Sequence, residues 1–322
     1  MTAVPEDRLV TVYGGSGFIG RHVVRALAKS GWRIRVAVRR PDLAHHLQPL
    51  GRVGQIHAVQ ANLRFPDSVA RAAAGADALV NLVGILYESG RQTFDAIQAQ
   101  GAAAVARTAA DIGARLVQFS AIGADADSRS VYARTKAAGE VAAFAHVPSA
   151  VVLRPSIAFG PEDDFFNKFA AMARISPALP LIGGGKTHFQ PVFVGDVAAA
   201  VNAVLEGRAR PGTIYELGGP EIRTFDELMQ IMLREIGRRR LLIPLPFAIA
   251  RMQAFFLEWL PKPLVTRDQI AQLERDNVVS EAAQREGRTL QGLGISPTSL
   301  ETVLPTYLWR FRKAGQFSRP AT

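Results

Sequence analysis

Short apolar runs alternate with longer amphipathic segments along the first half of the chain. Five runs have the length and the β-branched content of buried strands: LVTVY (9–13), WRIRVAVRR (32–40), QIHAVQANL (55–63), DALVNLVGIL (77–86) and RLVQFSAIG (115–123). Between the first two, RHVVRALAKSG (21–31) places Val23, Val24 and Leu27 on one helical face, and Gly31 follows as a stop signal. The longest of the later alanine-rich segments extends roughly from Phe94 to Gly113.

Strands separated by helices indicate βαβ units, so we expect an α/β fold with a doubly wound parallel sheet. The rhythm changes near Val151, where VVLRPSIAFGP (151–161) has the pattern of one more strand. Pro/Gly-rich pieces then mix with helices expected near 196–206 and 224–237. We therefore predict one domain over 1–160 and a smaller C-terminal α/β lobe over 161–322, interleaved with the last strands of the sheet.

The composition permits a full hydrophobic core and limits the chemistry. Hydrophobic residues make up 48% of the 322 residues, which argues against disorder. The chain has no cysteine, and this excludes disulfides, thiolate metal ligands and a thiol nucleophile. Because the six histidines show no ligand spacing, we expect no metal site.

A formal net charge of +10 implies attraction to an anionic partner. Dinucleotide phosphates, anionic lipid head groups and acidic protein surfaces all qualify, whereas the dispersed arginines carry no nucleic-acid-binding signature. The first residues show no apolar signal-peptide segment, and no apolar run reaches the length of a membrane span. We expect a cytoplasmic protein and leave open a peripheral position on the cytoplasmic face of a bacterial inner membrane.

The segment YGGSGFIG (13–20) follows the first strand and opens the first helix. Its glycines match two spacings of the dinucleotide-binding turn, in which the backbone must approach a pyrophosphate closely. The free N–H groups at the start of the helix would point at the phosphates. We therefore predict an NAD(P)-binding Rossmann fold whose site includes Gly14, Ser16, Gly17, Phe18, Ile19 and Gly20.

Arg39 and Arg40 end the second strand, where NAD-binding chains usually carry an acidic residue for the ribose 2′-hydroxyl. A guanidinium group suits a 2′-phosphate instead, because its fork of donors matches phosphate oxygens. The sequence therefore predicts NADP(H) as the cofactor. The alternative is that both arginines are solvated surface residues.

Tyr132 and Lys136, in SVYARTKAAGE (130–140), lie one helical turn apart and share a face. The spacing alone fits both a proton-transfer pair and two solvent-facing side chains. An ammonium about 4 Å from the phenol would favour the phenolate. It would lower the pKa of a tyrosine from its ordinary value of about 10 toward a working range.

Several motifs together resemble the short-chain dehydrogenase/reductase superfamily, in its atypical branch. They are GGSGFIG (14–20), NLVG (81–84), FSAIGA (119–124), YARTK (132–136), LRPSIAFGP (153–161), FQPVFVGDVA (189–198) and YELGGPEIRTFDEL (215–228). The segment LVTRDQIAQLERDNVVS (264–280) is more similar to the nucleotide-binding accessory subunit of respiratory complex I and its bacterial homologues than to sugar-nucleotide epimerases.

The resemblance implies roles for individual residues. Tyr132 matches the family's acid/base, Lys136 the group that holds the ribose hydroxyls, and Ser120 the hydroxyl that binds the substrate oxygen. A further set matches positions along the cofactor: Arg39 at the 2′-phosphate, Asn62 and Leu63 near the adenine, and Val83, Gly84, Pro155 and Ile157 near the nicotinamide and its ribose. Asn62 replaces the aspartate of many relatives, and Gln98 lies near the position of their asparagine.

Two parts of the C-terminal half leave alternatives open. Arg154 either fixes a substrate or pairs with a carboxylate. The apolar stretch LLIPLPFAIARMQAFFLEWLPKPLV (241–265) follows three arginines at 238–240. Over 241–263 it forms either a core-facing helix that covers the cleft or an interfacial element, with its apolar face in lipid or on a partner and basic residues toward anionic head groups.

The resemblance implies an NADP(H)-binding protein associated with respiratory complex I or with quinone metabolism, in which the cofactor has a structural role. The alternatives are an active NADP-dependent oxidoreductase on a hydrophobic carbonyl or hydroxyl substrate, and a sugar-nucleotide epimerase or dehydratase. The expected partners are NADPH, respiratory complex I or another membrane protein, and an anionic lipid surface.

Overall fold

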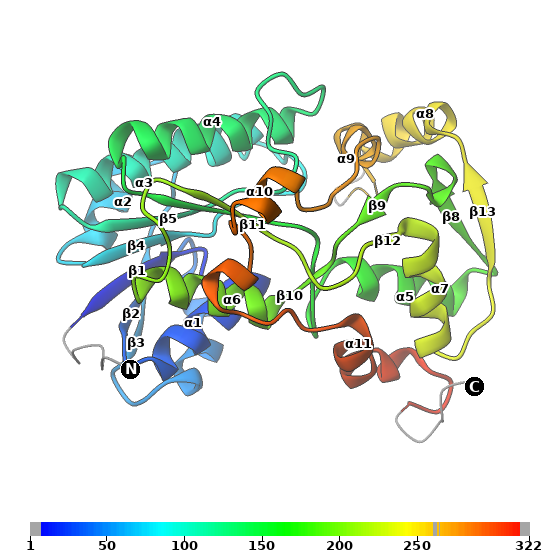
Figure 1. Cartoon of the computed structure of the whole chain (residues 1–322), viewed down its shortest axis with the longest axis horizontal. Helices are drawn as coiled ribbons and strands as arrows, with labels where there is room; N and C mark the ends of the chain where they lie inside the picture. The colour runs from blue at the N-terminus through cyan, green and yellow to red at the C-terminus, as the bar shows by residue number, and fades with distance from the viewer. Residues whose placement is uncertain (1–7, 260–262, 264, 316–322) are drawn as a thin grey trace.

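The computed structural model describes residues 8–259, 263 and 265–315. Its larger part is a seven-stranded parallel sheet with helices on both faces, and a smaller lobe lies at the other end of the molecule (Figure 1). The sheet has the order β3-β2-β1-β4-β5-β6-β11. Its strands are β1 (Leu9–Tyr13), β2 (Arg33–Val38), β3 (Ile56–Gln60), β4 (Ala78–Asn81), β5 (Arg115–Phe119), β6 (Val151–Pro155) and β11 (Ile214–Leu217). The doubly wound α/β fold predicted from the alternation of strands and helices is confirmed.

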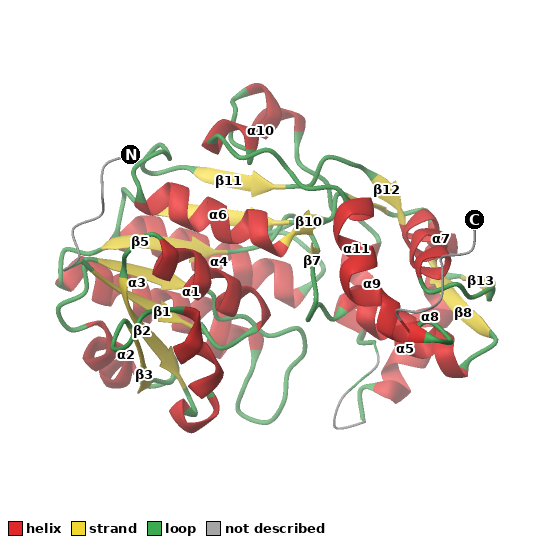
Figure 2. Cartoon of the chain, turned by 90° about the horizontal axis from the view of Figure 1, so that it is seen from below, coloured by secondary structure: helices red, strands yellow, loops and turns green. Residues whose placement is uncertain are grey.

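Two layers of helices cover the sheet (Figures 1 and 2). One face carries α1 (Phe18–Lys29) and α6 (Val194–Leu205), and the other carries α2 (Pro66–Ala73), α3 (Gln100–Asp111) and α4 (Val131–His146). Side chains of a strand alternate between faces, so Val10 and Val12 join the core under α1 while Tyr13 joins the core under α2. Both layers are apolar, as a parallel sheet covered on two sides requires.

The strand order reverses beside β1, because β2 and β4 flank it on opposite sides. Crevices at the carboxyl ends of strands form at such a reversal and are the usual ligand sites of open α/β sheets. The glycine turn follows β1 there, and the segments after β4, β5 and β6 reach the same edge. The topology therefore gathers most of the predicted site residues at one end of the sheet.

The smaller lobe has a core of its own. Its helices are α5 (Phe165–Ile175), α7 (Phe225–Glu235) and α11 (Leu300–Leu308), which enclose an aromatic-rich cluster. Three two-stranded pairs complete it, namely β7 (Ala158–Phe159) with β10 (Val192–Phe193), β9 (His188–Phe189) with β12 (Arg223–Thr224), and β8 (Ala178–Ile182) with β13 (Leu241–Leu245). The remaining α-helices among the described residues are α8 (Phe247–Leu257), α9 (Arg267–Leu273) and α10 (Glu281–Arg285).

The burial of side chains along helix α8 distinguishes the two interpretations of the apolar stretch, for the residues that the structure describes. It buries the small side chains of Ala250 and Ala254, whereas Phe256 and Trp259 are 68% and 82% exposed. The alternative of a core-facing helix therefore does not hold for Phe256 and Trp259, whereas Phe247 is half-buried and packs against the cluster of Ala250, Ala254 and Ile270. Residues 260–262 and 264 lie outside the described residues. No helix within the described ranges combines the length and the apolar character needed to cross a bilayer.

Candidate functional site

The glycine turn joins β1 to α1 at the carboxyl edge of the sheet. Gly14 has a φ of +79°, and its N–H donates to the carbonyl of Ala37 on β2 at 3.1 Å. The N–H of Gly17 donates to the carbonyl of Gly14 at 3.1 Å, and α1 then begins. A Cβ on Gly17 would meet only that carbonyl oxygen, at 3.4 Å. The turn is therefore closely packed at Gly14, whereas the space beside the Cα of Gly17 is open. A pyrophosphate needs such an open side to approach the backbone closely.

The two arginines after β2 take different partners. Arg39 donates a hydrogen bond to the side-chain oxygen of Gln92, which lies in the segment between β4 and α3. Arg40 instead binds Asp42 through two donors at 2.7 and 3.1 Å. Arg39 follows the strand end that contacts the glycine turn, whereas the charge of Arg40 is already compensated by a carboxylate.

The segment after β4 lies between the glycine turn and α4. The side chain of Val83 covers Gly14, since a Cβ there would lie 3.1 Å from it. Gly84 lies next to Lys136, whose Nζ would be 3.1 Å from a Cβ on Gly84. The absence of a side chain at Gly84 therefore brings the ammonium of α4 close to the backbone that follows β4.

The segments after β3 and β6 carry the remaining predicted cofactor-binding residues, which are Asn62, Leu63, Pro155 and Ile157. Asn62 uses its side-chain oxygen to accept the N–H of Arg64 at 3.2 Å, and Leu63 is buried. Pro155 ends β6, and the N–H of Ile157 donates to the side-chain oxygen of Asn277 at 3.2 Å. The amide oxygen of Asn62 is thus occupied within its own turn.

Helix α4 places Tyr132 and Lys136 against the end of β5. The Nζ of Lys136 lies 5.7 Å from the centre of the Tyr132 ring and donates a long hydrogen bond, 3.5 Å, to the carbonyl of Phe119. Ser120 follows in the chain, is 5% exposed, and its hydroxyl has no partner among the described residues. Buried polar atoms are normally hydrogen bonded, so this hydroxyl indicates a place for a ligand atom.

Gln98 is a buried polar residue to which the sequence analysis assigned a position but no role. The helix expected from Phe94 to Gly113 begins as a π-helix over Asp95–Ala99, an irregularity common at functional sites. Gln98 lies on this turn, is 2% exposed, and neither its amide oxygen nor its amide nitrogen has a described partner. Its oxygen lies 3.8 Å from the place of a Cβ on Gly84, beside the ammonium of Lys136.

The structure does not show the expected lowering of the Tyr132 pKa by Lys136. Burial and, to a lesser extent, the carboxylate of Asp268 raise the pKa of Tyr132 to about 12. Burial lowers the pKa of Lys136 to about 8, against the opposing effect of Glu140. The prediction of a phenol brought toward neutral pH is therefore wrong for this arrangement, because desolvation disfavours the charged form of each group.

Asp268 of α9 caps the helix that carries Tyr132 and Lys136. Its Oδ1 accepts the N–H of Val131 at 2.6 Å, and its Oδ2 accepts the hydroxyl of Ser130 at 2.8 Å. A carboxylate at this place satisfies free N–H groups and complements the helix dipole. Sequence analysis missed Asp268 because 137 residues separate it from Val131.

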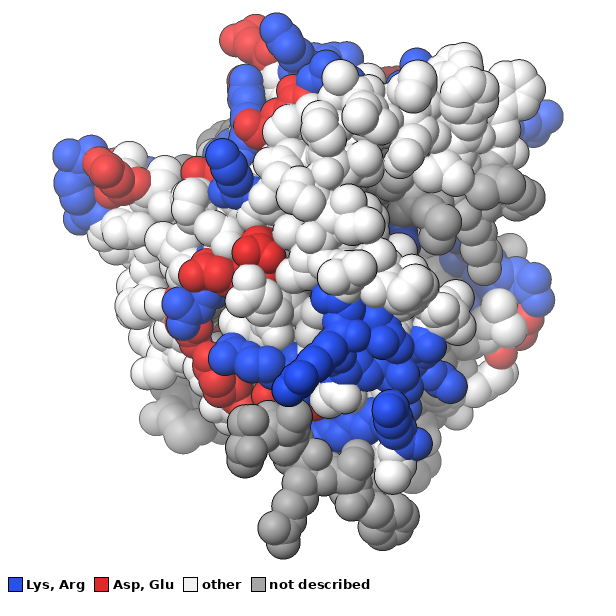
Figure 3. Space-filling model, turned by 90° about the vertical axis from the view of Figure 1, so that its right-hand side faces the viewer, with Lys and Arg blue, Asp and Glu red and all other residues white. Residues whose placement is uncertain are grey.

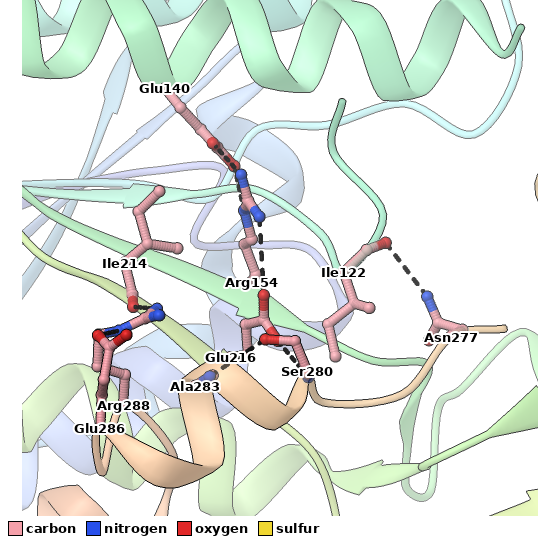
Figure 4. A network of polar contacts seen from close by, with 10 residues as sticks. All are labelled: Ile122, Glu140, Arg154, Ile214, Glu216, Asn277, Ser280, Ala283, Glu286 and Arg288. Atoms are coloured by element: carbon pink, nitrogen blue, oxygen red, sulfur yellow. Dashed lines mark hydrogen bonds and ion pairs between the residues drawn. The ribbon is translucent and has the colours of Figure 1, made fainter. Parts of the chain in front are cut away.

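Asn277 ties the same segment to the end of β6. Its Oδ1 accepts the hydroxyl of Ser156 at 2.6 Å. Its Nδ2 donates to the carbonyl of Ile122 at 3.2 Å, as Figure 4 shows. Arg275 pairs with Asp125 at 2.7 Å. The part of the 264–280 stretch that the structure describes thus lies across the site from α4 to β6, and its polar side chains hold the two together.

A buried ion network lies behind this segment (Figure 4). Arg154 of β6 donates to both carboxylate oxygens of Glu140 on α4, at 2.7 and 2.6 Å, and lies 3.7 Å from Glu216 on β11. Glu216 also accepts the N–H of Ser280 at 2.7 Å. Of the two alternatives for Arg154, the structure supports the carboxylate pair.

Known families and relatives agree with this architecture. The model of the NAD dependent epimerase/dehydratase family matches residues 10–218. The mitochondrial NADH dehydrogenase [ubiquinone] 1 alpha subcomplex subunit 9 of Arabidopsis thaliana is 36% identical over 320 residues, 95% of this chain and 79% of the relative. The ceramide reductase of Caulobacter vibrioides is 34% identical over 242 residues, 74% of each chain.

Solved structures show the same fold. A dTDP-glucose 4,6-dehydratase from Streptomyces venezuelae, with NAD and TYD bound, superposes with a TM-score of 0.70 at 22% identity, over 94% of this chain and 96% of the other. The UDP-glucose 4-epimerase of Thermus thermophilus, in complex with NAD, has a TM-score of 0.67 at 21% identity, over 95% and 99%. At these identities the likeness concerns the fold alone.

We expect Lys136→Met to stabilise the protein at neutral pH. Burial lowers the pKa of Lys136 from 10.5 to about 8, so the buried ammonium costs on the order of 3 kcal/mol of folding free energy below pH 8. This cost declines as the pH rises from 8 to 10.5, because the folded-state amine is already neutral and the unfolded-state lysine loses its proton over this range. Denaturant unfolding at both ends of this window measures the gain. Lys29→Met, at an exposed position of α1, is the control, and a destabilised Lys136→Met variant would contradict the argument.

Proposed function

The chain belongs to the NAD dependent epimerase/dehydratase family, and from that premise we propose that it binds NADP(H) and works with a membrane complex of the respiratory complex I type. The single observation that carries the cofactor assignment is the open space above Gly17, bounded by the tight turn of Gly14. The relatives named as complex I subunits support the partner. We also propose a peripheral position at the membrane that holds this complex, on the cytoplasmic face of the inner membrane in a bacterium.

Residues of this chain fit the parts of the cofactor in order. The glycine turn and the start of α1 suit the pyrophosphate, and Arg39 suits the 2′-phosphate of NADP(H). Lys136 suits the ribose hydroxyls, while Ser120 and Gln98 offer buried polar atoms without described partners. Bound NADPH supplies a hydride, and the protein orients it and controls the proton that accompanies it.

Arg39→Ala should weaken NADPH binding at least about tenfold, the effect of losing a charge-assisted hydrogen bond, and leave NADH binding nearly unchanged. Arg40→Ala is the matched control, because Arg40 is already paired with Asp42. Calorimetric titration with both nucleotides measures the four affinities. Equal losses for NADPH and NADH, or a larger effect of Arg40→Ala, would defeat the assignment of the 2′-phosphate to Arg39.

A second candidate function is the reduction of a hydrophobic ketone, and the state of Tyr132 favours it. With a pKa raised to about 12 by burial and by Asp268, the phenol is protonated at neutral pH and suits a proton donor. In a reduction, the carbonyl carbon gains the hydride and the carbonyl oxygen gains the phenol proton. Ser120 would hold that oxygen. The relative named ceramide reductase supports a lipid-like substrate.

Tyr132→Phe separates the two functions. If the protein is a reductase, NADPH oxidation with long-chain β-keto amides, quinones or aldehydes should fall at least about 100-fold in the variant, with NADPH affinity unchanged. If the cofactor is structural, the wild type shows no such oxidation, and NADPH and a membrane complex accompany it through native purification. A wild-type protein that neither retains nor binds NADPH would overturn both.

A further inference from the structure

The outward face of the smaller lobe combines exposed apolar side chains with a cluster of arginines. We propose that this face, which comprises α8, Trp259, β13, Ile175 and the arginines 174 and 238–240, docks on a bilayer surface that carries anionic lipid head groups. The inference rests on the proposed membrane location but names lipid, rather than a protein, as what the face contacts. We call it the docking face.

Helix α8 has an inverted pattern of burial. Ala250 and Ala254, one turn apart, are buried toward α9, whereas Met252 and Phe256 are 59% and 68% exposed. Trp259, two residues beyond the end of α8, is 82% exposed. A surface helix of a soluble domain normally turns its large apolar residues inward. Here the small residues provide the contact with the protein, so the large side chains are available to a second apolar phase.

Strand β13 extends the apolar surface from α8 toward the end of α5. Leu241 and Ile243 on β13 are 71% and 51% exposed, and Ile175 is 89% exposed. The N–H of Leu241 donates to the carbonyl of Pro177 at 3.1 Å, which places the start of β13 two residues beyond Ile175. The exposed apolar side chains of β13 and Ile175 therefore lie near each other, and exposed apolar regions mark interaction sites.

The arginine cluster lies where β13 begins. Arg238 and Arg240 donate to the backbone carbonyls of Phe311 and Ala173, at 3.1 and 2.8 Å. Partial burial lowers the pKa of Arg238, and the positive charges of Arg240 and Arg174 lower it further. Within the described part of the chain, none of these arginines forms an ion pair with a carboxylate. Figure 3 shows a large Lys/Arg cluster on this side of the molecule, bordering a broad area without charge.

The combination favours an anionic bilayer over a protein. Aromatic side chains such as Trp259 and Phe256 are typical of the depth of lipid head groups, and arginines bind their phosphates. A two-fold dimer through this face would bring like charges together around its axis. The segment would lie on the membrane rather than span it, since the described helices are too short to cross one.

The docking face borders a hollow beside α9. Arg267 of α9 lies 5.2 Å over the ring of Phe255 on α8 and pairs with Glu258 at 2.8 Å. Arg267 and Glu258 also line a hollow of about 480 Å³ that reaches Phe94 and Val131 beside Tyr132. A bilayer on the docking face would therefore lie next to this hollow, whose lining includes Phe94, the ring neighbour of Tyr132.

Co-sedimentation with vesicles tests the proposal on the full chain. The wild type should bind vesicles of equal parts phosphatidylglycerol and phosphatidylcholine, and binding should weaken with salt. Phe256→Ser with Trp259→Ser should lower partitioning at least about tenfold. Arg174→Glu with Arg239→Glu should lower it about fivefold for each arginine. The matched controls are Leu43→Ser with Val53→Ser and Arg71→Glu with Arg107→Glu, all at exposed positions of the larger domain.

Three outcomes would overturn the inference. They are equal binding to pure phosphatidylcholine vesicles, equal losses in the controls, and absent vesicle binding with a self-association that the Phe256→Ser/Trp259→Ser variant removes. NADPH titration of each variant separates this failure from that of the proposed function. Normal NADPH binding without vesicle binding rejects the docking face alone, whereas vesicle binding without NADPH binding rejects the cofactor assignment alone.

Discussion

Gly17→Ala should weaken NADPH binding at least about tenfold while it leaves the free energy of unfolding nearly unchanged. Gly17 has a φ of −73°, which alanine adopts without strain, and the added methyl group would have one neighbour, the carbonyl oxygen of Gly14 at 3.4 Å. The methyl group would occupy the open side of the turn, where a pyrophosphate must approach the backbone. The loss therefore concerns the ligand and not the fold.

Gly20→Ala is the matched comparison, and we expect it to damage both binding and stability. A Cβ on Gly20 would lie 2.4 Å from the carbonyl oxygen of Gly14 and 2.6 Å from backbone atoms of Gly15. Backbone on both sides cannot yield as a side chain would, so we expect a cost of about 3 kcal/mol. Denaturant unfolding and NADPH titration of both variants check the contrast. Normal NADPH binding by Gly17→Ala would mean that the turn does not contact the cofactor.

Arg154→Met should lower the free energy of unfolding by about 4 kcal/mol, the scale of a broken buried ion pair. Arg154 is 20% exposed and Glu140 is 6% exposed, with a shortest distance of 2.6 Å between them. Without the guanidinium, the carboxylates of Glu140 and Glu216 would stay buried and uncompensated. The loss would also loosen α4, and with it Tyr132 and Lys136, from β6.

A rescue distinguishes charge from packing in this network. Glu140→Gln with Glu216→Gln, added to Arg154→Met, should recover most of the stability because no uncompensated charge remains. Arg40→Met, which breaks the exposed pair with Asp42, should change stability by less than about 1 kcal/mol. Thermal or denaturant unfolding measures all three. A small effect of Arg154→Met would show that the network is not needed to hold α4 in place.

The local sequence pattern was sufficient to predict the strands and helices of the larger domain. The run LVTVY became β1 with the bounds expected, and the glycines after it form the tight turn that their spacing predicts. These features depend on residues within one or two turns of each other, so their physics is visible in a short window. The predicted helix from Phe94 to Gly113 shows the limit, because its start is a π-helix that places Gln98 in the site.

The apolar stretch shows the limit in another way. Its composition fitted both a core helix and an interfacial one, since nothing in a single segment says which side its neighbours cover. Packing against α9 chose Ala250 and Ala254 as the buried pair and left Phe256 and Trp259 outside. Burial depends on the partner surface, and that surface lies in another part of the chain.

By itself the sequence determined the doubly wound sheet, the glycine turn and the order in which Ser120, Tyr132 and Lys136 follow along the chain. Only the tertiary structure decided that Asp268 caps α4, that Asn277 binds the end of β6, and that burial raises the pKa of Tyr132 and lowers that of Lys136. The physical reason is the distance along the chain over which each effect acts. Backbone geometry and periodicity depend on residues a few positions apart. Desolvation and capping depend on distant segments that the fold brings together, and the hydrogen bonds of Asp268 and Asn277 join groups more than 100 residues apart.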